Sequence, residues 1–254
     1  MLDNNLIFLI QNLVLKDFRI RYRNMSLGVT WSVANPLLMM GILTFVFTRI
    51  FANPTVHHFA LFLLCALVPF NFYSLASNAG STSLLDNQTL IKRIQCPRAV
   101  FPIASVLSSS LHFLIQIALL IFLLLVFGHK VNRYWLLLPA IWGMEVVFLC
   151  GFSLMTAALD IYYRDVRYLV EASGLVMFWM VPVFYSLEMI PQRYREFYML
   201  NPIAAVAVAG RRVLIDAAPP PVFLLLQLSA VSIAFLAIGF VVFRWLERDF
   251  ADYL

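Results

Sequence analysis

The side chains of this sequence with the most potential for chemistry are the polar ones that lie within long apolar runs. Glu145 interrupts one such run, and His112 and Gln116 share one face of another predicted helix. Because ionisable groups in apolar surroundings usually serve a function, they predict a polar path for a hydrophilic substrate. The alternative is a hydrogen bond that joins two helices, which the pattern favours for His112.

The remaining polar residues give no pattern for catalysis or for metal binding. Asp160 and Asp165 are close in sequence, but Arg164 and Arg167 beside them favour ion pairs over acid–base chemistry. The histidines form no His-x-x-Glu-His or comparable cluster. No Gly-x-x-x-x-Gly-Lys-Ser/Thr loop occurs, so the usual backbone nest for a nucleotide is missing. We therefore expect no catalytic residue, no metal ligand and no cofactor in this chain.

The composition indicates that the chain lies in a membrane. Of 254 residues, 63% are hydrophobic and 12% are charged, with a mean hydropathy of +0.88. Soluble domains are about 45–50% apolar and about 25% charged, and a globule of this size could not bury the excess. We expect an all-α polytopic membrane protein without a removable signal peptide. A soluble enzyme, a nucleic-acid-binding domain and a disordered chain are excluded.

Six apolar segments approach or exceed the roughly 20 residues that a helix needs to cross a bilayer. They are residues 31–51, 59–75, 103–127, 135–159, 169–187 and 222–243. Lys and Arg are more numerous on the side that holds both termini, which predicts cytoplasmic termini. We expect a single transmembrane domain over residues 1–254, in which residues 27–250 form the six-span unit.

Residues 1–26 are predicted to form an amphipathic helix that lies in the membrane surface. Its narrow polar stripe consists of Asn5, Asn12, Lys16, Arg19 and Arg23, and Ile7, Ile10, Val14 and Phe18 lie opposite. Basic residues in such a helix lie near anionic headgroups. Arg21 falls on the apolar side, so either the helix has ended there or the side chain snorkels.

The loop between the last two predicted spans, residues 186–221, contains a short apolar piece at residues 202–208. This piece is too short to cross a bilayer and is typical of a re-entrant segment. Such backbone at membrane depth is buried in protein or lines a wet cavity, which would indicate a conduit. A cap on the outer surface is the other interpretation, and the sequence leaves both open.

The connection between the second and third predicted spans contains a short amphipathic helix, residues 86–94, that Pro97 stops. Leu90, Ile91 and Ile94 cluster on one side of it. This apolar side fits a groove on a cytoplasmic partner or packs on the interfacial helix of the same chain. The pattern does not decide between these interpretations.

Five stretches in register along nearly the whole chain resemble the permease subunits of type-2 ABC transporters that export polysaccharides. The first is KDFRIRYRNMSLGVTWSVANPLLMMGILTFVF, with the matching elements Asp17, Arg21-Tyr22-Arg23, Leu27-Gly28, Trp31 and Asn35-Pro36. The second is LFLLCALVPFNFYS, which has Ala66 and Phe70 where this family commonly has Gly and Trp. The others are NQTLIKRIQCPRAVFP, similar to a coupling helix and its Pro-Arg turn, IYYRDVRYL and MLNPIAAVAVAGRRVL.

The resemblance implies two paired copies of this chain and two cytoplasmic P-loop ATPase subunits, which carry the ATP and Mg²⁺. The implied ATPase-coupling residues are Asp86, Asn87, Leu90, Ile91, Arg93, Ile94, Arg164 and Asp165. The resemblance also implies a site where the lipid-linked glycan and its phosphates enter the transporter. The residues implied at this entry site are Lys16, Arg19, Arg21, Arg23 and Trp31.

A sugar polymer must slide along its path, and aromatic rings bind it weakly and without fixed register. The candidate residues of this path are Glu145, Trp179, Phe184, Tyr185, Arg211 and Arg212, with core packing as the alternative for the aromatic ones. We expect a permease in the bacterial cytoplasmic membrane that exports an O-antigen or teichoic-acid-like polysaccharide and binds no nucleic acid. The alternatives are a type-2 permease for a drug or small lipid and a membrane-embedded glycan-modifying transferase.

Overall fold

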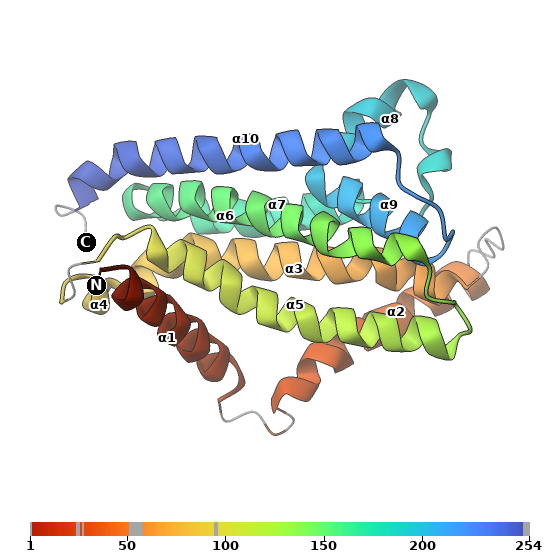
Figure 1. Ribbon diagram of the computed structural model, residues 1–254, viewed down its shortest axis with the longest axis horizontal. Helices are drawn as coiled ribbons and strands as arrows, with labels where there is room; N and C mark the ends of the chain where they lie inside the picture. The colour runs from red at the N-terminus through yellow and green to blue at the C-terminus, as the bar shows by residue number, and fades with distance from the viewer. Residues whose placement is uncertain (1, 24–25, 27, 51–57, 94–95, 251–254) are drawn as a thin grey trace.

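Helices make up the regular structure of the computed structural model, which describes residues 2–23, 26, 28–50, 58–93 and 96–250 (Figure 1). The long helices are α1 (Leu2–Tyr22), α2 (Trp31–Phe45), α3 (Phe59–Asp86), α5 (Val100–Val126), α6 (Leu138–Tyr162), α7 (Val166–Met180) and α10 (Val222–Leu246). The shorter ones are α4 (Gln88–Ile91), α8 (Gln192–Met199) and α9 (Pro202–Leu214). Single helical turns are Gly28–Thr30, Val46–Ile50, Arg133–Leu137, Leu187–Met189 and Glu247–Asp249. Both described ends of the chain lie at one end of the bundle, here named the terminal end.

The central helix is α3, which packs against α2, α5, α6, α7 and α9. Its first half is apolar on every side, as expected for a helix surrounded by others. Phe72 of α3 stacks on Phe113 of α5 with ring centroids 4.4 Å apart. Because so many neighbours converge on it, α3 fixes the positions of the other helices.

Small residues let α6 approach two of its neighbours closely. A Cβ atom on Gly239 of α10 would overlap the carbonyl of Gly151, and one on Gly80 of α3 would overlap the side chain of Ser153. Close backbone approach at small residues is a common way for helices to pack in membranes. The result is a rigid unit of α3, α6 and α10.

Among the described residues, five helical stretches are long and apolar enough to cross a membrane. They are Gly28–Ile50, Phe59–Asp86, Val100–Val126, Arg133–Tyr162 and Val222–Asp249, which coincide with five of the predicted spans. The remaining prediction, residues 169–187, had the wrong boundaries because α7 ends at Met180. Pro182 explains this end, since the residue before a proline favours extended backbone and Val181 adopts it.

The second predicted span ended too early, because α3 continues from residue 75 to Asp86. In this polar half, side chains donate hydrogen bonds to backbone carbonyls one turn earlier. The Ser77 hydroxyl donates to the Tyr73 carbonyl at 2.6 Å, and the Asn78 amide donates to the Ser74 carbonyl at 2.7 Å. Such local bonds satisfy polar side chains inside a helix without an outside partner.

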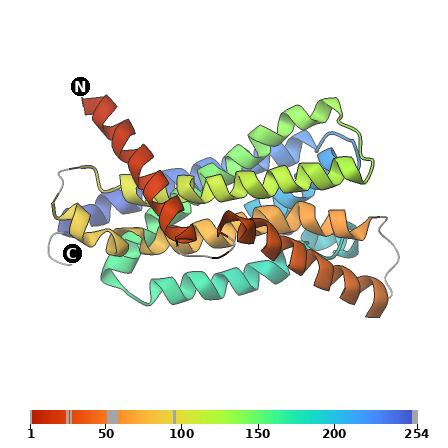
Figure 2. The same cartoon turned by 90° about the horizontal axis from the view of Figure 1, so that it is seen from below.

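The N-terminal helix α1 is inclined to the long helices and lies against α5 (Figure 2). It ends at Tyr22 rather than at residue 26, and it runs through Arg21, so the interpretation that it had ended there was wrong. Leu13 faces the bundle and is buried in a cluster with Leu84 and Phe101. One side of α1 is therefore covered by the chain itself.

The short apolar piece of the last loop forms α9, which packs inside the bundle against α3, α6 and α10. Asn201 begins this helix, and its side-chain oxygen accepts a hydrogen bond from the Ile203 amide at 3.0 Å. Pro202 at the first position suits a helix start as well.

Candidate functional site

The predicted coupling helix at residues 86–94 is shorter than expected. Asp86 is the last residue of α3, only Gln88–Ile91 forms α4, and Ile94 lies outside the described residues. The break lies at Asn87, whose side-chain amide donates to the Ser83 carbonyl at 2.8 Å. Its side-chain oxygen accepts from the Lys16 ammonium at 2.6 Å, which ties α1 to the end of α3.

Leu90 and Ile91 pack against the buried cluster around Leu13 of α1. These side chains are therefore partly covered within the chain, and docking of α4 on a cytoplasmic partner stays a prediction. The exposed residues around α4 are Asp86, Thr89, Lys92 and Arg93. A partner at this end would meet polar and charged side chains first.

The C-terminal end of α10 holds the connection that follows α4. The Arg98 guanidinium donates to the Glu247 carbonyl at 3.2 Å and lies 5.7 Å from the centre of the Phe250 ring. The Tyr162 hydroxyl at the end of α6 donates to the Leu246 carbonyl at 2.8 Å. The sequence resemblance placed Arg98 in the Pro-Arg turn after the predicted coupling helix, but nothing local in the sequence reveals its contact with residues so distant in the chain.

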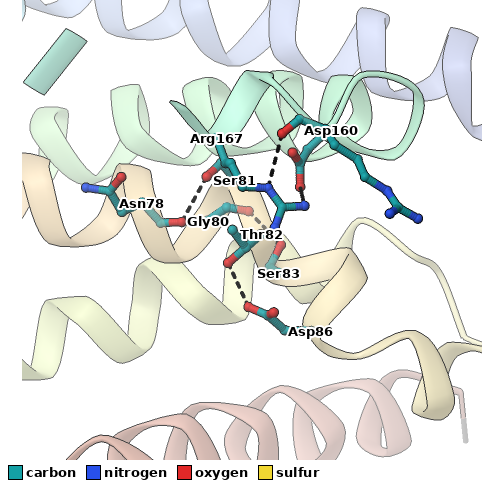
Figure 3. Close-up of polar contacts among 9 residues, drawn as sticks. Asn78, Gly80, Ser81, Thr82, Ser83, Asp86, Asp160 and Arg167 are labelled. Atoms are coloured by element: carbon teal, nitrogen blue, oxygen red, sulfur yellow. Dashed lines mark hydrogen bonds and ion pairs between the residues drawn. The ribbon is translucent and has the colours of Figure 1, made fainter. Parts of the chain in front are cut away.

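Arg164 and Asp165 lie exposed in the turn between α6 and α7, also at the terminal end. Nearby, the Arg167 guanidinium pairs with the carboxylate of Asp160 at 3.4 Å, as the sequence predicted for this basic pair. Figure 3 shows Asp160 and Arg167 facing the polar stretch of α3. Asp160 is completely buried, and an acid engaged with an arginine is poorly suited to acid–base catalysis.

The predicted lipid-phosphate residues divide between two hollows beside α1. Lys16, Arg19 and Arg23 line a groove of about 860 Å³ along α1. Arg21 and Lys16 line a second, polar hollow of about 440 Å³ between α1, α3 and α5. Burial lowers the pKa of Arg21. Trp31 begins α2 and is 45% exposed.

A polar network joins α1, α2 and α5. The Tyr22 hydroxyl contacts Nδ1 of His112 and lies 2.6 Å from the Ser32 hydroxyl. Gln116 lies 3.1 Å from Nε2 of His112 and donates to the Ser32 carbonyl at 3.3 Å. The interhelical hydrogen bond that was favoured for His112 is thus confirmed.

The predicted path residues occupy different surroundings. Trp179, Phe184 and Tyr185 form one aromatic cluster with neighbouring ring centroids 5.3 Å apart, and Trp179 is 66% exposed. Glu145 is completely buried in α6, and its carboxylate has no hydrogen-bond partner within the described residues. Whether any of them touches a substrate stays a prediction.

Arg211 is buried under the chain that follows α7, and Arg212 beside it is partly exposed. The Arg211 guanidinium donates to the carbonyls of Phe62 at 2.9 Å and Val183 at 2.6 Å and contacts that of Pro182. It also stacks 3.5 Å from the centre of the Phe62 ring. These bonds fix the extended segment at the end of α7, and a role of Arg211 in the substrate path stays a prediction.

A cleft between α2, α3 and α7 with a partly polar lining escaped the sequence analysis. It has a volume of about 430 Å³, and Asn35, Asn71, Ser74 and Glu171 line it together with apolar side chains such as Leu67, Phe70 and Phe178. The signal was present, because Glu171 is an ionisable residue within the predicted fifth span, as Glu145 is within the fourth. Figure 2 shows α2 and α7 on the same side of α3, so the cleft opens between two outer helices.

Comparisons with known proteins give a consistent result. A family model described as ABC-2 type transporter matches residues 9–215. The O-antigen export system permease protein RfbA of Klebsiella pneumoniae is 29% identical over 246 residues, which cover 94% of this chain and 92% of that protein. RfbA of Myxococcus xanthus is 24% identical, covering 96% and 94%. The polysialic acid transport protein KpsM of Escherichia coli is 23% identical, covering 94% and 93%.

Proposed function

The chain belongs to the family of ABC-2 type transporters, and from this premise we propose that it is the permease subunit of an ATP-driven exporter of a lipid-linked polysaccharide. The observation that carries the proposal is the match to O-antigen export permeases over nearly their whole length. The relatives are named as transport proteins, so this chain is a transporter component rather than an enzyme. Its several apolar helices suit the bacterial inner membrane.

The proposed topology has six passages and cytoplasmic termini. Five passages are the long apolar helices, and α7 with the extended segment after it provides the sixth. We assign α9 to a re-entrant segment, because its backbone is buried among α3, α6 and α10 as membrane depth requires. Residues 1–254 then form one transmembrane domain, with α1 in the membrane surface.

We place the ATPase at the terminal end, which becomes the cytoplasmic end. The exposed Asp86, Arg93, Arg164 and Asp165 form the contact surface in this proposal. In this proposal the ATPase does not touch Leu90, Ile91 and Asn87 directly. These residues instead hold α4 against α1 and against the end of α3. A push on α4 would therefore move two helices as rigid bodies.

The sugars pass along the cleft between α2, α3 and α7 in this proposal. Its amide, hydroxyl and carboxylate groups can exchange hydrogen bonds with a sliding glycan, and Phe70 and Phe178 add aromatic faces. The groove along α1 with Lys16, Arg19 and Arg23 would receive the phosphates, because a phosphate that enters the membrane needs compensating cations. A second copy would complete the path.

The test is reconstitution of this chain in vesicles with and without candidate P-loop ATPases. We expect one ATPase to co-purify with the chain, and ATP-dependent movement of a lipid-linked glycan only when both are present. Cells without the chain should accumulate the glycan on the inner face of the membrane. Transport by the chain alone, without any ATPase, would contradict the proposal.

A further inference from the structure

A second hollow beside α7 has a much less polar lining than the cleft between α2, α3 and α7. It is a groove of about 520 Å³ between α6, α7, α10 and the start of α9. Its lining is almost entirely apolar, with Phe148, Phe152, Met177, Met180 and Phe235 among the largest side chains. The volume lies within the range of about 300–1,000 Å³ that is typical of ligand sites.

One helix, α7, separates the groove from the cleft. Val170, Ser173 and Met177 line the groove, whereas Glu171, Gly174 and Phe178 line the cleft. Each set recurs every three to four residues and the two sets are offset by one residue, so they occupy two separate faces of the helix. Ala172, Val176 and Trp179 lie on a third, exposed face.

The wall between the two hollows is thin. Tyr73 of α3 lines the groove, and its hydroxyl lies 3.3 Å from the Ser173 hydroxyl, whereas Asn71 and Ser74 of the same helix line the cleft. A cleft with a partly polar lining and an apolar groove thus lie on two faces of α7.

We propose that the apolar groove holds the hydrocarbon tail of the lipid-linked glycan while the sugars lie in the cleft. This inference rests on the proposed function. A molecule with a sugar part and a hydrocarbon part needs two different surroundings side by side, and the two faces of α7 supply them. The flexible side chains of Met177 and Met180 can adapt to an irregular hydrocarbon chain. The groove lies beside the spanning helices α6 and α10, where hydrocarbon is the surrounding medium.

The direct test uses a photoreactive p-benzoylphenylalanine in place of Met180 in the groove, with Val176 on the exposed face as the matched control position. The full chain with its ATPase is illuminated in vesicles that contain a radiolabelled polyprenyl diphosphate or, in a second arm, a radiolabelled phospholipid. We expect the polyprenyl probe to label position 180 at least about tenfold more than position 176, a preference of about 1.4 kcal/mol. Equal labelling, labelling by the phospholipid alone, or cross-linking of position 180 to a second copy would overturn the inference.

A second test fills the groove. Ser173→Trp places a large side chain in it, whereas Ala172→Trp places the same side chain on the exposed face. We expect Ser173→Trp to raise the concentration of lipid-linked substrate needed for half-maximal export about tenfold, with unchanged ATPase co-purification, and Ala172→Trp to leave it unchanged. Export by Ser173→Trp at the unmodified concentration, with the groove labelled as before, would overturn the inference. If the unmodified chain exports nothing with its ATPase, the proposed function fails, whatever the groove binds.

Discussion

The helices α3 and α2 have similar chemistry but different surroundings. The most apolar stretch of α3 has a hydropathy of 2.0 and is 72% buried within the chain, whereas that of α2 and its following turn has a hydropathy of 1.6 and is 6% buried. The difference teaches that apolar composition shows that a helix is kept away from water, but it does not show what covers the helix. α3 is covered by its own chain, whereas α2 must be covered by lipid or by another copy.

The largest expected effect on stability comes from substituting one glycine in each of the two helices. A Cβ atom on Gly80 of α3 would overlap Ser153, but one on Gly41 of α2 would meet no atom within 4 Å. We expect Gly80→Leu to destabilise the protein by about 3 kcal/mol or to prevent folding, because a packed helix interface cannot absorb the volume. Gly41→Leu should leave stability unchanged. Thermal unfolding in detergent, followed by size-exclusion chromatography, measures both.

If the two variants unfold alike, the different burial of α2 and α3 has no energetic meaning. A loss of copy pairing in Gly41→Leu at unchanged thermal stability would instead sharpen the comparison, because it would place the second copy on α2.

Pairing of two copies predicts the next effect. Leu38 and Ile42 on α2 are exposed in the single chain. In a background without Cys65, Cys96 and Cys150, we expect Leu38→Cys or Ile42→Cys to form disulfide-linked dimers under mild oxidation. Val241→Cys on exposed α10 is the matched control and should stay monomeric on a non-reducing gel. Dimers through position 241 alone would place the second copy on the opposite side.

How much of this arrangement the sequence predicts depends on how local the cause is. Five spans follow from continuous apolar runs, and the start of α9 follows from Asn201 and Pro202. The end of α7 was also predictable, because Pro182 is a local signal that the apolar pattern obscured. The packing of Leu90 against the cluster around Leu13 of α1 was not predictable, because an amphipathic pattern shows which side of a helix is covered but not what covers it.

The candidate site divides in the same way. In the sequence, Glu145 and Glu171 are both ionisable residues within predicted spans. In the structure, Glu145 of α6 is completely buried, whereas Glu171 of α7 lines the cleft. The helices packed around each position distinguish them, and these neighbours depend on contacts between residues that are distant in the sequence. Arg211 was assigned to the path by its charge, but five donors of a guanidinium can equally well fix a backbone bend.

At the terminal end, two substitutions with smaller expected effects distinguish docking of the ATPase from the stability of the fold. Leu90 is partly buried against the cluster that contains Leu13 of α1, whereas the Arg93 side chain is exposed. We expect Leu90→Ala to cost about 2 kcal/mol of stability, the lower end for a truncated leucine. Arg93→Glu should leave stability unchanged and weaken co-purification of the ATPase. If Arg93→Glu retains full ATPase binding while Leu90→Ala alone loses it without loss of stability, the apolar side of α4 is the docking surface after all.

The smallest effect concerns the hydroxyl of Tyr22, which joins α1 to His112 and Ser32. Tyr22→Phe keeps the ring against Phe18, at 5.0 Å between centroids, and removes only the hydrogen bonds. We expect a loss of about 1 kcal/mol, the usual net value of such a bond. Because α1 also packs through Leu13, this loss should loosen the C-terminal turns of α1 and leave its first turns in place. Hydrogen exchange of the α1 amides measures the difference: faster exchange near Tyr22 and unchanged exchange near Leu13 support a latch at one end, whereas uniform acceleration would show that α1 is held as a single unit.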